Sequence, residues 1–183
     1  MEEDTLMQRA AEGDVQAFGQ LVKAHQPRLI RFATRMLGDA ERAEDAVQEA
    51  FLRLWRARAR YQAQGSFACF LLRIVRNACL DQARNALPTA CLEEVADSPL
   101  PAAEEPAARL QAEALAEAVR RAVQSLPEAQ RAVFVLSQYE GLSYQEIAAM
   151  LECPVGTVAS RKHLAVETLR RRLGPWNEEE IPK

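Results

Sequence analysis

Hydrophobic side chains recur at intervals of three and four positions along much of the chain. This spacing places them on one face of an α-helix, the face that a globular protein buries. The first such helix ends at a turn around Gly38. Its apolar face carries Phe18, Leu21, Val22, His25, Leu29, Phe32 and Met36. Because His25 lies within this stripe, we expect it to be a packed core residue.

A second helix is predicted after Gly38, and a third after a loop at residues 61–66 that contains Gly65. Each has an apolar face and a polar face. The polar face of the second helix carries Glu44, Asp45, Gln48, Glu49 and Arg53. The polar face of the third carries Arg73, Arg76, Asn77, Asp81 and Arg84. Together the three helices predict a small helical domain over residues 1–86.

The C-terminal part of the chain predicts three elements in close succession. Pro127 suits the first turn of a helix that ends before Gly141. Ser143 and Glu146 have the spacing of a capping box, which opens a short helix. A break at Pro154 precedes a longer helix that runs to about residue 173. A short helix, a tight turn and a longer polar helix form a helix-turn-helix.

A segment rich in proline and acidic residues separates the two groups of helices. It contains Pro88, Pro99, Pro101 and Pro106, and its composition interrupts helices and cannot bury a core. The seven glycines and 6% aromatic residues also favour helices over sheets. We therefore predict an all-α protein with two small helical domains, residues 1–86 and 111–174. A flexible acidic linker at 87–110 joins them, and an acidic tail follows at 175–183.

The formal net charge of −3 conceals an alternation along the chain. Residues 28–84 carry a net charge of +5 and residues 119–173 carry +3, whereas residues 85–118 carry −6. A basic block in each predicted domain is compatible with binding to nucleic acid, because charge acts through faces and segments.

Several classes of site are not predicted. Cys69, Cys79, Cys91 and Cys153 form no CxxC pair and no cluster with histidine, so we expect reduced thiols and no metal. The sequence has no nucleophile motif and no glycine-rich phosphate loop, so we expect no cofactor, no small-molecule substrate and no enzyme activity. The acidic first residues do not resemble a secretory signal, and no apolar run has membrane-spanning length. We expect a cytoplasmic protein.

The helix-turn-helix suggests a DNA-reading surface. The start of its second helix fits the major groove, where outward side chains reach base edges and phosphates. In this chain those side chains are Thr157, Ser160, Arg161 and His163. The same order of elements also occurs in bundles that bind no DNA, and the pattern alone leaves that alternative open.

Two blocks of the sequence resemble the extracytoplasmic-function (ECF) sigma factors of the sigma-70 family. Residues 142–148 (LSYQEIA) and 153–158 (CPVGTV), with Ser160 and Arg161, are similar to region 4. Residues 44–55 (EDAVQEAFLRLW) resemble region 2.2, and residues 67–84 resemble regions 2.3 and 2.4. The resemblance implies a factor that binds core RNA polymerase and directs promoter-specific transcription initiation. With only a linker between the blocks, the chain resembles the compact group rather than primary sigma factors.

The resemblance implies that the polar face of the second helix docks on core polymerase, with the clamp helices of the largest subunit as its target. The residues concerned are Asp45, Gln48, Glu49 and Arg53. The second-largest subunit is also expected as a partner. A solvated helix face is the alternative, although carboxylates gathered opposite an apolar stripe suit a basic partner.

The resemblance further implies that the loop at 61–66 and the third helix open the minus-10 promoter element and hold a flipped base. The residues expected to contact this DNA are Tyr61, Phe67, Arg73, Arg76, Asn77 and Arg84. Cationic and planar side chains suit unpaired strands. For Phe67 a core position is an equal alternative, because it begins the apolar face. Phe70 stands where the family often has Trp, which roughly preserves apolar volume.

Region 4 is expected to read the minus-35 duplex through Thr157, Ser160, Arg161 and His163. Here the sequence departs from the family pattern at Ala159, Lys162 and Leu164. Lys162 falls on the inward stripe, from which its long stem could extend to solvent. We therefore expect weaker or unusual minus-35 recognition, offset by the three arginines at residues 170–172.

Two other functions remain open from the sequence. A stand-alone helix-turn-helix regulator would bind duplex DNA without polymerase, but residues 1–84 show no dimerisation or ligand domain. A protein-interaction module with a degraded recognition helix would bind polymerase or a regulator without promoter preference. For the sigma-factor interpretation, the resemblance adds promoter DNA and an anti-sigma factor as partners.

Overall fold

The computed structural model describes residues 2–62, 66–85 and 106–174. In this part of the chain all regular elements are helices, which confirms the predicted all-α fold class. The chain divides into two compact units, Met1–Glu93 and Glu94–Lys183, each considered by itself below. Residues 87–105 of the predicted linker, residue 86 before it and the predicted tail at 175–183 lie outside the described residues.

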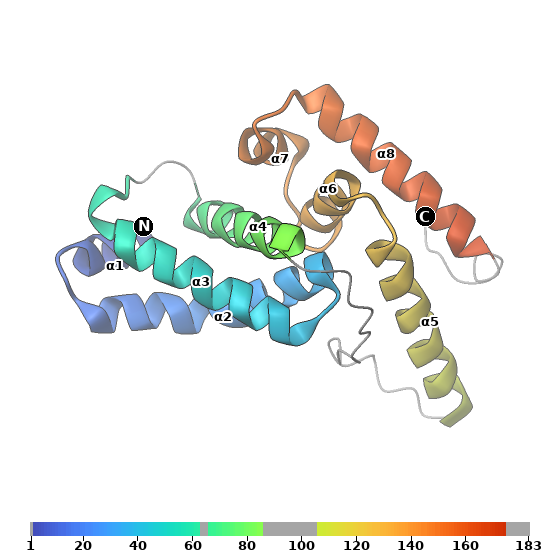
Figure 1. Cartoon of the computed structure of the whole chain (residues 1–183), viewed down its shortest axis with the longest axis horizontal. Helices are drawn as coiled ribbons and strands as arrows, with labels where there is room; N and C mark the ends of the chain where they lie inside the picture. The colour runs from blue at the N-terminus through green and yellow to red at the C-terminus, as the bar shows by residue number, and fades with distance from the viewer. Residues whose placement is uncertain (1, 63–65, 86–105, 175–183) are drawn as a thin grey trace. The chain divides into compact units, whose positions relative to one another are not determined.

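The first unit contains α1 (Glu2–Ala11), α2 (Val15–Leu37), α3 (Ala40–Ala57), the 3-10 helix η1 (Arg58–Arg60) and α4 (Phe67–Asn85). Helices α2, α3 and α4 pack against one another in every pair, and α1 contacts α2 and η1 (Figure 1). Gly38 ends α2 with a φ of 75°, a left-handed conformation that glycine adopts without steric cost. The three helices expected from the sequence are confirmed.

The core of the first unit follows the predicted apolar stripes. Its fully buried side chains include Leu21, Leu29, Phe32, Val47, Leu54, Leu71 and Val75. His25 is also a core residue, as expected, with only 8% of its surface exposed. Its Nε2 lies 2.9 Å from Glu3 Oε1 of α1, so the polar end of the ring faces a carboxylate.

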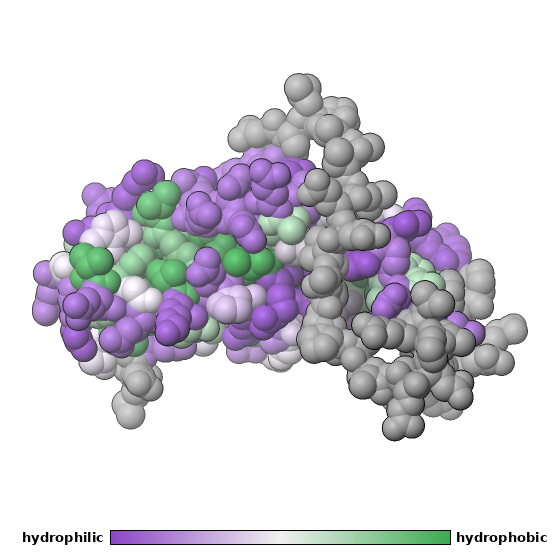
Figure 2. Space-filling view, turned by 90° about the horizontal axis from the view of Figure 1, so that it is seen from below, coloured by the Kyte–Doolittle hydropathy of each residue, from purple (hydrophilic) through white to green (hydrophobic). Residues whose placement is uncertain are grey.

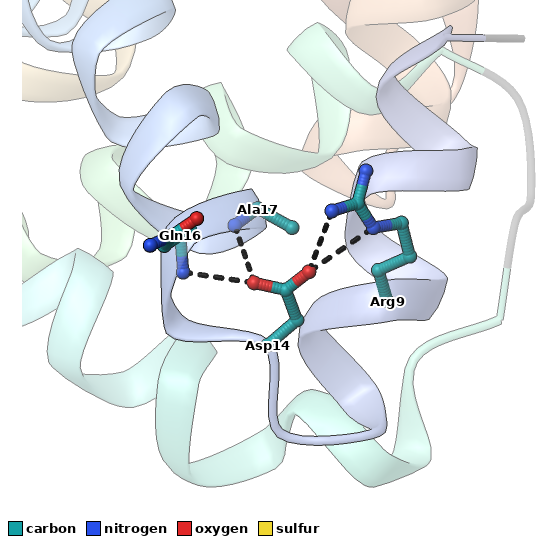
Figure 3. Close-up of polar contacts among 4 residues, drawn as sticks. All are labelled: Arg9, Asp14, Gln16 and Ala17. Atoms are coloured by element: carbon teal, nitrogen blue, oxygen red, sulfur yellow. Dashed lines mark hydrogen bonds and ion pairs between the residues drawn. The ribbon is translucent and has the colours of Figure 1, made fainter.

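Helix α1 is an element that the sequence analysis does not predict. Met7 and Ala10 are fully buried on the first unit, although a helix of ten residues offers only a short apolar stripe. Asp14 then caps α2, because its Oδ1 accepts the backbone N–H groups of Gln16 and Ala17 at 2.9 and 3.0 Å. Its Oδ2 accepts Arg9 Nε and Nη2 at 3.1 and 2.7 Å (Figure 3). These bonds hold the pKa of Asp14 below its usual value and join α1 to α2.

The second unit contains α5 (Pro106–Gln124), α6 (Glu128–Gln138), α7 (Tyr144–Leu151) and α8 (Val155–Arg172). Helix α8 contacts the other three, and α6 also contacts α7. Their shared core includes Val123, Leu126, Val133, Leu136, Ile147, Val158, Ala165 and Leu169. The predicted helix before Gly141, the short helix and the longer final helix are confirmed.

Helix α5 begins inside the range 87–110 that the sequence predicts as linker. Pro106 is its first residue, a position where the missing N–H of proline has no intrahelical partner to lose. The residues that follow are mostly Ala, Arg, Leu, Gln and Glu, which are strong helix formers. Residues 106–110 are therefore helical, and the prolines that signalled a linker extend one residue into the helix.

Some apolar surface stays outside the two cores. Figure 2 shows apolar side chains gathered in a band between hydrophilic margins on the face that it presents. Val15 and Leu52 of the first unit are 67% and 49% exposed, and Leu164 of the second is 46% exposed. Among the described helices, none is both long enough and apolar enough to cross a membrane.

Candidate functional site

The polar face of α3 brings the four predicted polymerase-binding residues together. Asp45 and Gln48 are exposed, and Glu49 and Arg53 are half-buried. Arg53 Nε donates to Glu49 Oε1, and its Nη1 donates to Asp81 Oδ2 of α4, both at 2.8 Å. These carboxylates, Glu49 first, raise the pKa of Arg53. Arg53 therefore links α3 to α4, while Asp45 and Gln48 extend to solvent.

A cavity of about 340 Å³ lies among residues of α3, η1 and α4. It is lined by Arg53, Leu54, Ala57, Arg60, Tyr61, Gln62, Phe70, Ile74 and Asn77. The lining combines two aromatic rings, two guanidinium groups and two amides. Its volume and its apolar wall with a few polar groups fall within the range of small-molecule sites.

Aromatic rings form one wall of this cavity. The ring centroid of Tyr61 lies 5.4 Å from that of Phe70 and 5.8 Å from that of Phe67, both edge to face. His25 packs against Phe67 from the core side at 5.5 Å. Phe67 is only 3% exposed, so it occupies the core position foreseen as its alternative. Phe70, which the sequence analysis treats only as an apolar residue, lines the cavity instead.

Tyr61 is held at the cavity by a residue far away in the sequence. Its hydroxyl donates to Asp4 Oδ1 of α1 at 2.8 Å. Burial, followed by this contact with Asp4, strongly raises the pKa of Tyr61. The sequence gives no signal for Asp4, because the two residues are brought together only by the packing of α1 on η1.

The outer surface of α4 carries the predicted cations. Arg73 and Arg84 are exposed, and Arg76 is half-buried. Arg73 lies over the Phe70 ring, with its guanidinium carbon 5.6 Å from the centroid. Arg76 Nη1 donates to Asn77 Oδ1 at 3.1 Å, which orients an amide that lines the cavity. The cationic side of α4 is therefore continuous with the cavity.

Helices α7 and α8 form the predicted helix-turn-helix. The capping box is confirmed, since the Glu146 N–H donates to Ser143 Oγ at 3.3 Å and the Ser143 N–H donates to Glu146 Oε2 at 2.8 Å. Helix α7 ends at Leu151, and the next residue, Glu152, caps it with a φ of 51°, in the left-handed region. Helix α8 then starts directly after Pro154.

The four predicted base-reading residues lie on the first three turns of α8. Ser160 and His163 are exposed, and Thr157 and Arg161 are half-buried. Ser160 Oγ donates to the carbonyl of Gly156 at 2.9 Å within the helix. Arg161 Nη1 lies 4.0 Å from Cys153 Sγ in the turn. The side chains share one end of α8 but differ in how far they extend to solvent.

Lys162 turns back onto α6. Its Nζ donates to Ser137 Oγ at 2.6 Å and to Gln138 Oε1 at 3.1 Å, and it lies 4.8 Å from the centroid of the Phe134 ring. Burial lowers the pKa of Lys162. Leu164 is exposed, as its predicted outward position requires. The stem of Lys162 thus replaces apolar packing at this point, and its ammonium group joins α8 to α6.

The described cysteines, Cys69, Cys79 and Cys153, are free thiols. Burial raises the pKa of Cys79 to about 12. Cys91 lies outside the described residues. Within the described ranges, no three His, Cys, Asp or Glu residues are grouped so as to hold a metal ion.

Both candidate surfaces fall within segments that match known families. Residues 21–87 match Sigma-70 region 2, and residues 116–169 match Sigma-70, region 4. The chain is 33% identical to the RNA polymerase sigma-H factor of Pseudomonas aeruginosa, over 95% of each protein. It is 31% identical to the ECF RNA polymerase sigma-E factor of Escherichia coli K12, over 94% of this chain and 95% of the relative. The chain belongs to the ECF sigma factors of the sigma-70 family.

Solved structures agree with this assignment. The ECF sigma factor described here aligns with CnrH, solved in complex with the cytosolic domain of CnrY, with a TM-score of 0.70 and 27% identity. That alignment covers 96% of this chain and 99% of CnrH. This chain also aligns with the sigma factor RpoE of Bartonella quintana, solved with the anti-sigma factor NepR, with a TM-score of 0.68 and 25% identity. This second alignment covers 87% of this chain and 98% of RpoE.

The family assignment supports the sigma-factor interpretation over a stand-alone regulator. A sigma factor directs promoter-specific transcription initiation, and this chain carries both of the matched regions. A stand-alone helix-turn-helix regulator would not account for region 2. The sigma-70 family is not a class of enzymes.

Proposed function

We propose that this sigma factor grips core RNA polymerase through α3, holds an unpaired promoter base in the cavity beside α4, and reads the minus-35 duplex with α8. The observation that carries the proposal is the cavity of about 340 Å³, lined by Tyr61, Phe70 and Asn77. Arg73 lies over the Phe70 ring and Arg76 bonds Asn77, so cations of α4 neighbour the lining. Unpaired strands are bound by this combination of stacking surfaces and cations.

The α3 face is proposed to meet the clamp helices of the largest polymerase subunit. Asp45 and Gln48 make the direct contacts, because they extend to solvent. Glu49 and Arg53 act partly as a pair, and Arg53 also holds α4 through Asp81. The ion pair between Arg53 and Asp81 therefore connects the proposed polymerase-binding helix α3 to α4, the helix proposed to contact DNA. The second-largest subunit is proposed as an additional partner.

The cavity is proposed to take a flipped base of the non-template minus-10 strand. Tyr61 and Phe70 supply its aromatic wall, and Asn77 supplies an amide able to hydrogen-bond a base edge. Phe67 supports the two rings from the core. The phosphates of the strand meet the guanidinium groups on the outer surface of α4, which belong to Arg73, Arg76 and Arg84.

Helix α8 is proposed to enter the major groove of the minus-35 element, with contacts from Thr157, Ser160, Arg161 and His163. Lys162 makes no contact of this kind, because its ammonium group is held by Ser137 and Gln138 on α6. This loss is consistent with the weaker minus-35 recognition expected from the sequence.

We propose an anti-sigma factor as a regulatory partner. Two structures similar to this chain were solved as complexes, CnrH with the cytosolic domain of CnrY and RpoE with the anti-sigma factor NepR. We further propose that the protein works in the cytoplasm and performs no covalent chemistry of its own, since polymerisation belongs to the polymerase.

Reconstituted transcription tests the proposal. Full-length chain is added to core polymerase with a genomic promoter library, and the transcript starts are sequenced; we expect a shared upstream motif. Asn77→Ala should lower open-complex formation by about tenfold, because it removes the amide from the cavity. Gln26→Ala, on an exposed part of α2, is the control. Transcription no more selective than that of core polymerase alone would overturn the proposal.

Charge reversal tests the polymerase contact separately. Asp45→Arg should weaken binding to core polymerase by at least about tenfold, because it places a cation against a basic partner surface. Glu12→Arg is the matched control, since it reverses an exposed carboxylate just after α1. If the two variants bind core polymerase with equal affinity in a fluorescence assay, α3 is not part of the interface.

A further inference from the structure

Helix α1 does not line the candidate base-binding cavity, but it contacts Tyr61, a residue that does. It lies outside residues 21–87, which match region 2, and the cavity lining contains no residue of α1. Yet α1 contacts η1, the short helix that leads directly into Tyr61. The point of connection is the hydrogen bond of 2.8 Å from the Tyr61 hydroxyl to Asp4 Oδ1.

Asp4 sits on a helix that is itself well anchored. Its residues Met7 and Ala10 are completely buried in the first unit. At its C-terminal end, Arg9 forms a forked contact with Asp14, the N-cap of α2 (Figure 3). At its N-terminal end, Glu3 lies 2.9 Å from His25 of the core. The Asp4 carboxylate therefore has a fixed position relative to the core.

Tyr61, by contrast, follows the end of a three-residue 3-10 helix and has an extended backbone. Two kinds of contact hold its side chain: edge-to-face packing on Phe67 and Phe70, and the hydrogen bond to Asp4. A hydrogen bond at the far end of the ring has narrow limits of distance and angle, so it adds a directional restraint to the edge-to-face packing.

We propose that Asp4 is a positioning residue for the promoter-opening site, and that by accepting the Tyr61 hydroxyl bond it sets the aromatic wall of the base-binding cavity. This inference rests on the proposed function, because it assigns a base to that cavity. Asp4 acts through Tyr61 and contacts no DNA. Helix α1 is thereby part of the promoter-opening apparatus, although it lies outside the matched region 2.

Two measurements on the full chain test this role. The first is fluorine NMR of protein labelled with 3-fluorotyrosine, in which Tyr61→Phe identifies one of the three tyrosine signals. Asp4→Ala should shift that signal. Asp4→Asn should leave it near its original position, because the amide oxygen still accepts the bond. Glu12→Ala, which removes an exposed carboxylate just after α1, is the matched control.

The second measurement is the affinity of each reconstituted holoenzyme for fork-junction DNA with an unpaired minus-10 strand. Asp4→Ala should weaken binding by about fivefold, the size of one ordinary hydrogen bond, and Asp4→Asn should restore most of the loss. In a Tyr61→Phe background, Asp4→Ala should change affinity by less than about twofold, because the bond is already gone.

The outcomes separate the two proposals. If Asn77→Ala and Tyr61→Ala weaken fork binding while Asp4→Ala leaves it unchanged, the cavity stands and the role of Asp4 is wrong. The role of Asp4 is also wrong if its alanine variant costs as much affinity in the Tyr61→Phe background as in the unchanged protein, since Asp4 would then act by another route. If the unchanged holoenzyme shows no preference for the unpaired strand, the proposed function itself fails.

Discussion

Arg131 of α6 donates hydrogen bonds to the end of α5 and to the turn that follows it, and replacing it should destabilise the second unit. Its Nη2 donates to the backbone carbonyls of Gln124 and Leu126 at 2.6 and 3.0 Å, and its Nη1 donates to Gln124 Oε1 at 3.0 Å. The last carbonyls of a helix lack intrahelical partners, and a cation also complements the helix dipole there. Arg131 is partly withdrawn from water, and this burial lowers its pKa.

The size of the effect follows from these contacts. Arg131→Met keeps most of the apolar stem but removes the donor from two backbone carbonyls. A net hydrogen bond from a charged group contributes about 1.5–3 kcal/mol, and desolvation of the guanidinium offsets part of that sum. We expect a loss of about 2–3 kcal/mol, equivalent to about 10–20 °C in the unfolding temperature of a domain of this size. Arg131→Lys keeps one cationic donor group and should lose about half as much.

Thermal unfolding followed by circular dichroism measures the loss, and hydrogen exchange locates it. Faster exchange should appear in peptides from α5, α6 and α8, while peptides from α2 and α3 keep their protection. Arg121→Met is the control, because Arg121 is an exposed arginine of α5 that pairs with Glu117 at the surface. The reasoning is refuted if Arg131→Met stays within about 0.5 kcal/mol of the unchanged protein, or if the methionine and lysine variants lose equal stability.

Three further predictions concern other sites. Ser143→Ala removes the N-cap of α7 and should lower the free energy of unfolding, measured by chemical denaturation, by about 1 kcal/mol. Ser125→Ala is the control, because the Ser125 hydroxyl donates to the nearby carbonyl of Ala122. An equal loss in both variants would contradict the prediction. Burial lowers the pKa of Lys162, so just below pH 10.5 the unfolded chain binds more protons than the folded one, and the free energy of unfolding should rise with pH there. In Lys162→Met this rise should be absent when unfolding is measured at several pH values. An unchanged slope in the variant would contradict the prediction. At neutral pH, Cys79 should react with maleimide far more slowly than Cys69 or Cys153, because it is buried and burial raises its pKa to about 12. Peptide mapping after timed labelling measures the three rates. Equal rates in the native protein would contradict the burial of Cys79.

The sequence was sufficient for the helices whose local signals agree with their packing. The stripe from Phe18 to Met36 has helical spacing and a glycine at its end, and α2 occupies that stretch. The box of Ser143 and Glu146 marks the first turn of α7, because a cap is formed by residues close in sequence. The family could also be recognised, since its motifs are contiguous stretches.

Local patterns were insufficient at α1 and at the start of α5. Helix α1 is short and has a narrow apolar stripe, so its stability comes from Met7 and Ala10 packing on the first unit. Proline at residue 106 signals a break in the sequence, but the same residue is tolerated at the first position of α5. Periodicity alone does not distinguish these two outcomes.

The arrangement of side chains at the site was decided by tertiary structure. The resemblance assigns Tyr61 and Phe67 to the minus-10 site, but only packing determines that Phe67 is buried while Phe70 lines the cavity. The bond from Tyr61 to Asp4 joins residues 57 positions apart, and that from Lys162 to Ser137 joins residues 25 apart. Hydrogen bonds depend on distances of about 3 Å between atoms. Such distances between remote residues are set by how helices cross, which a one-dimensional pattern of apolar and polar positions does not specify.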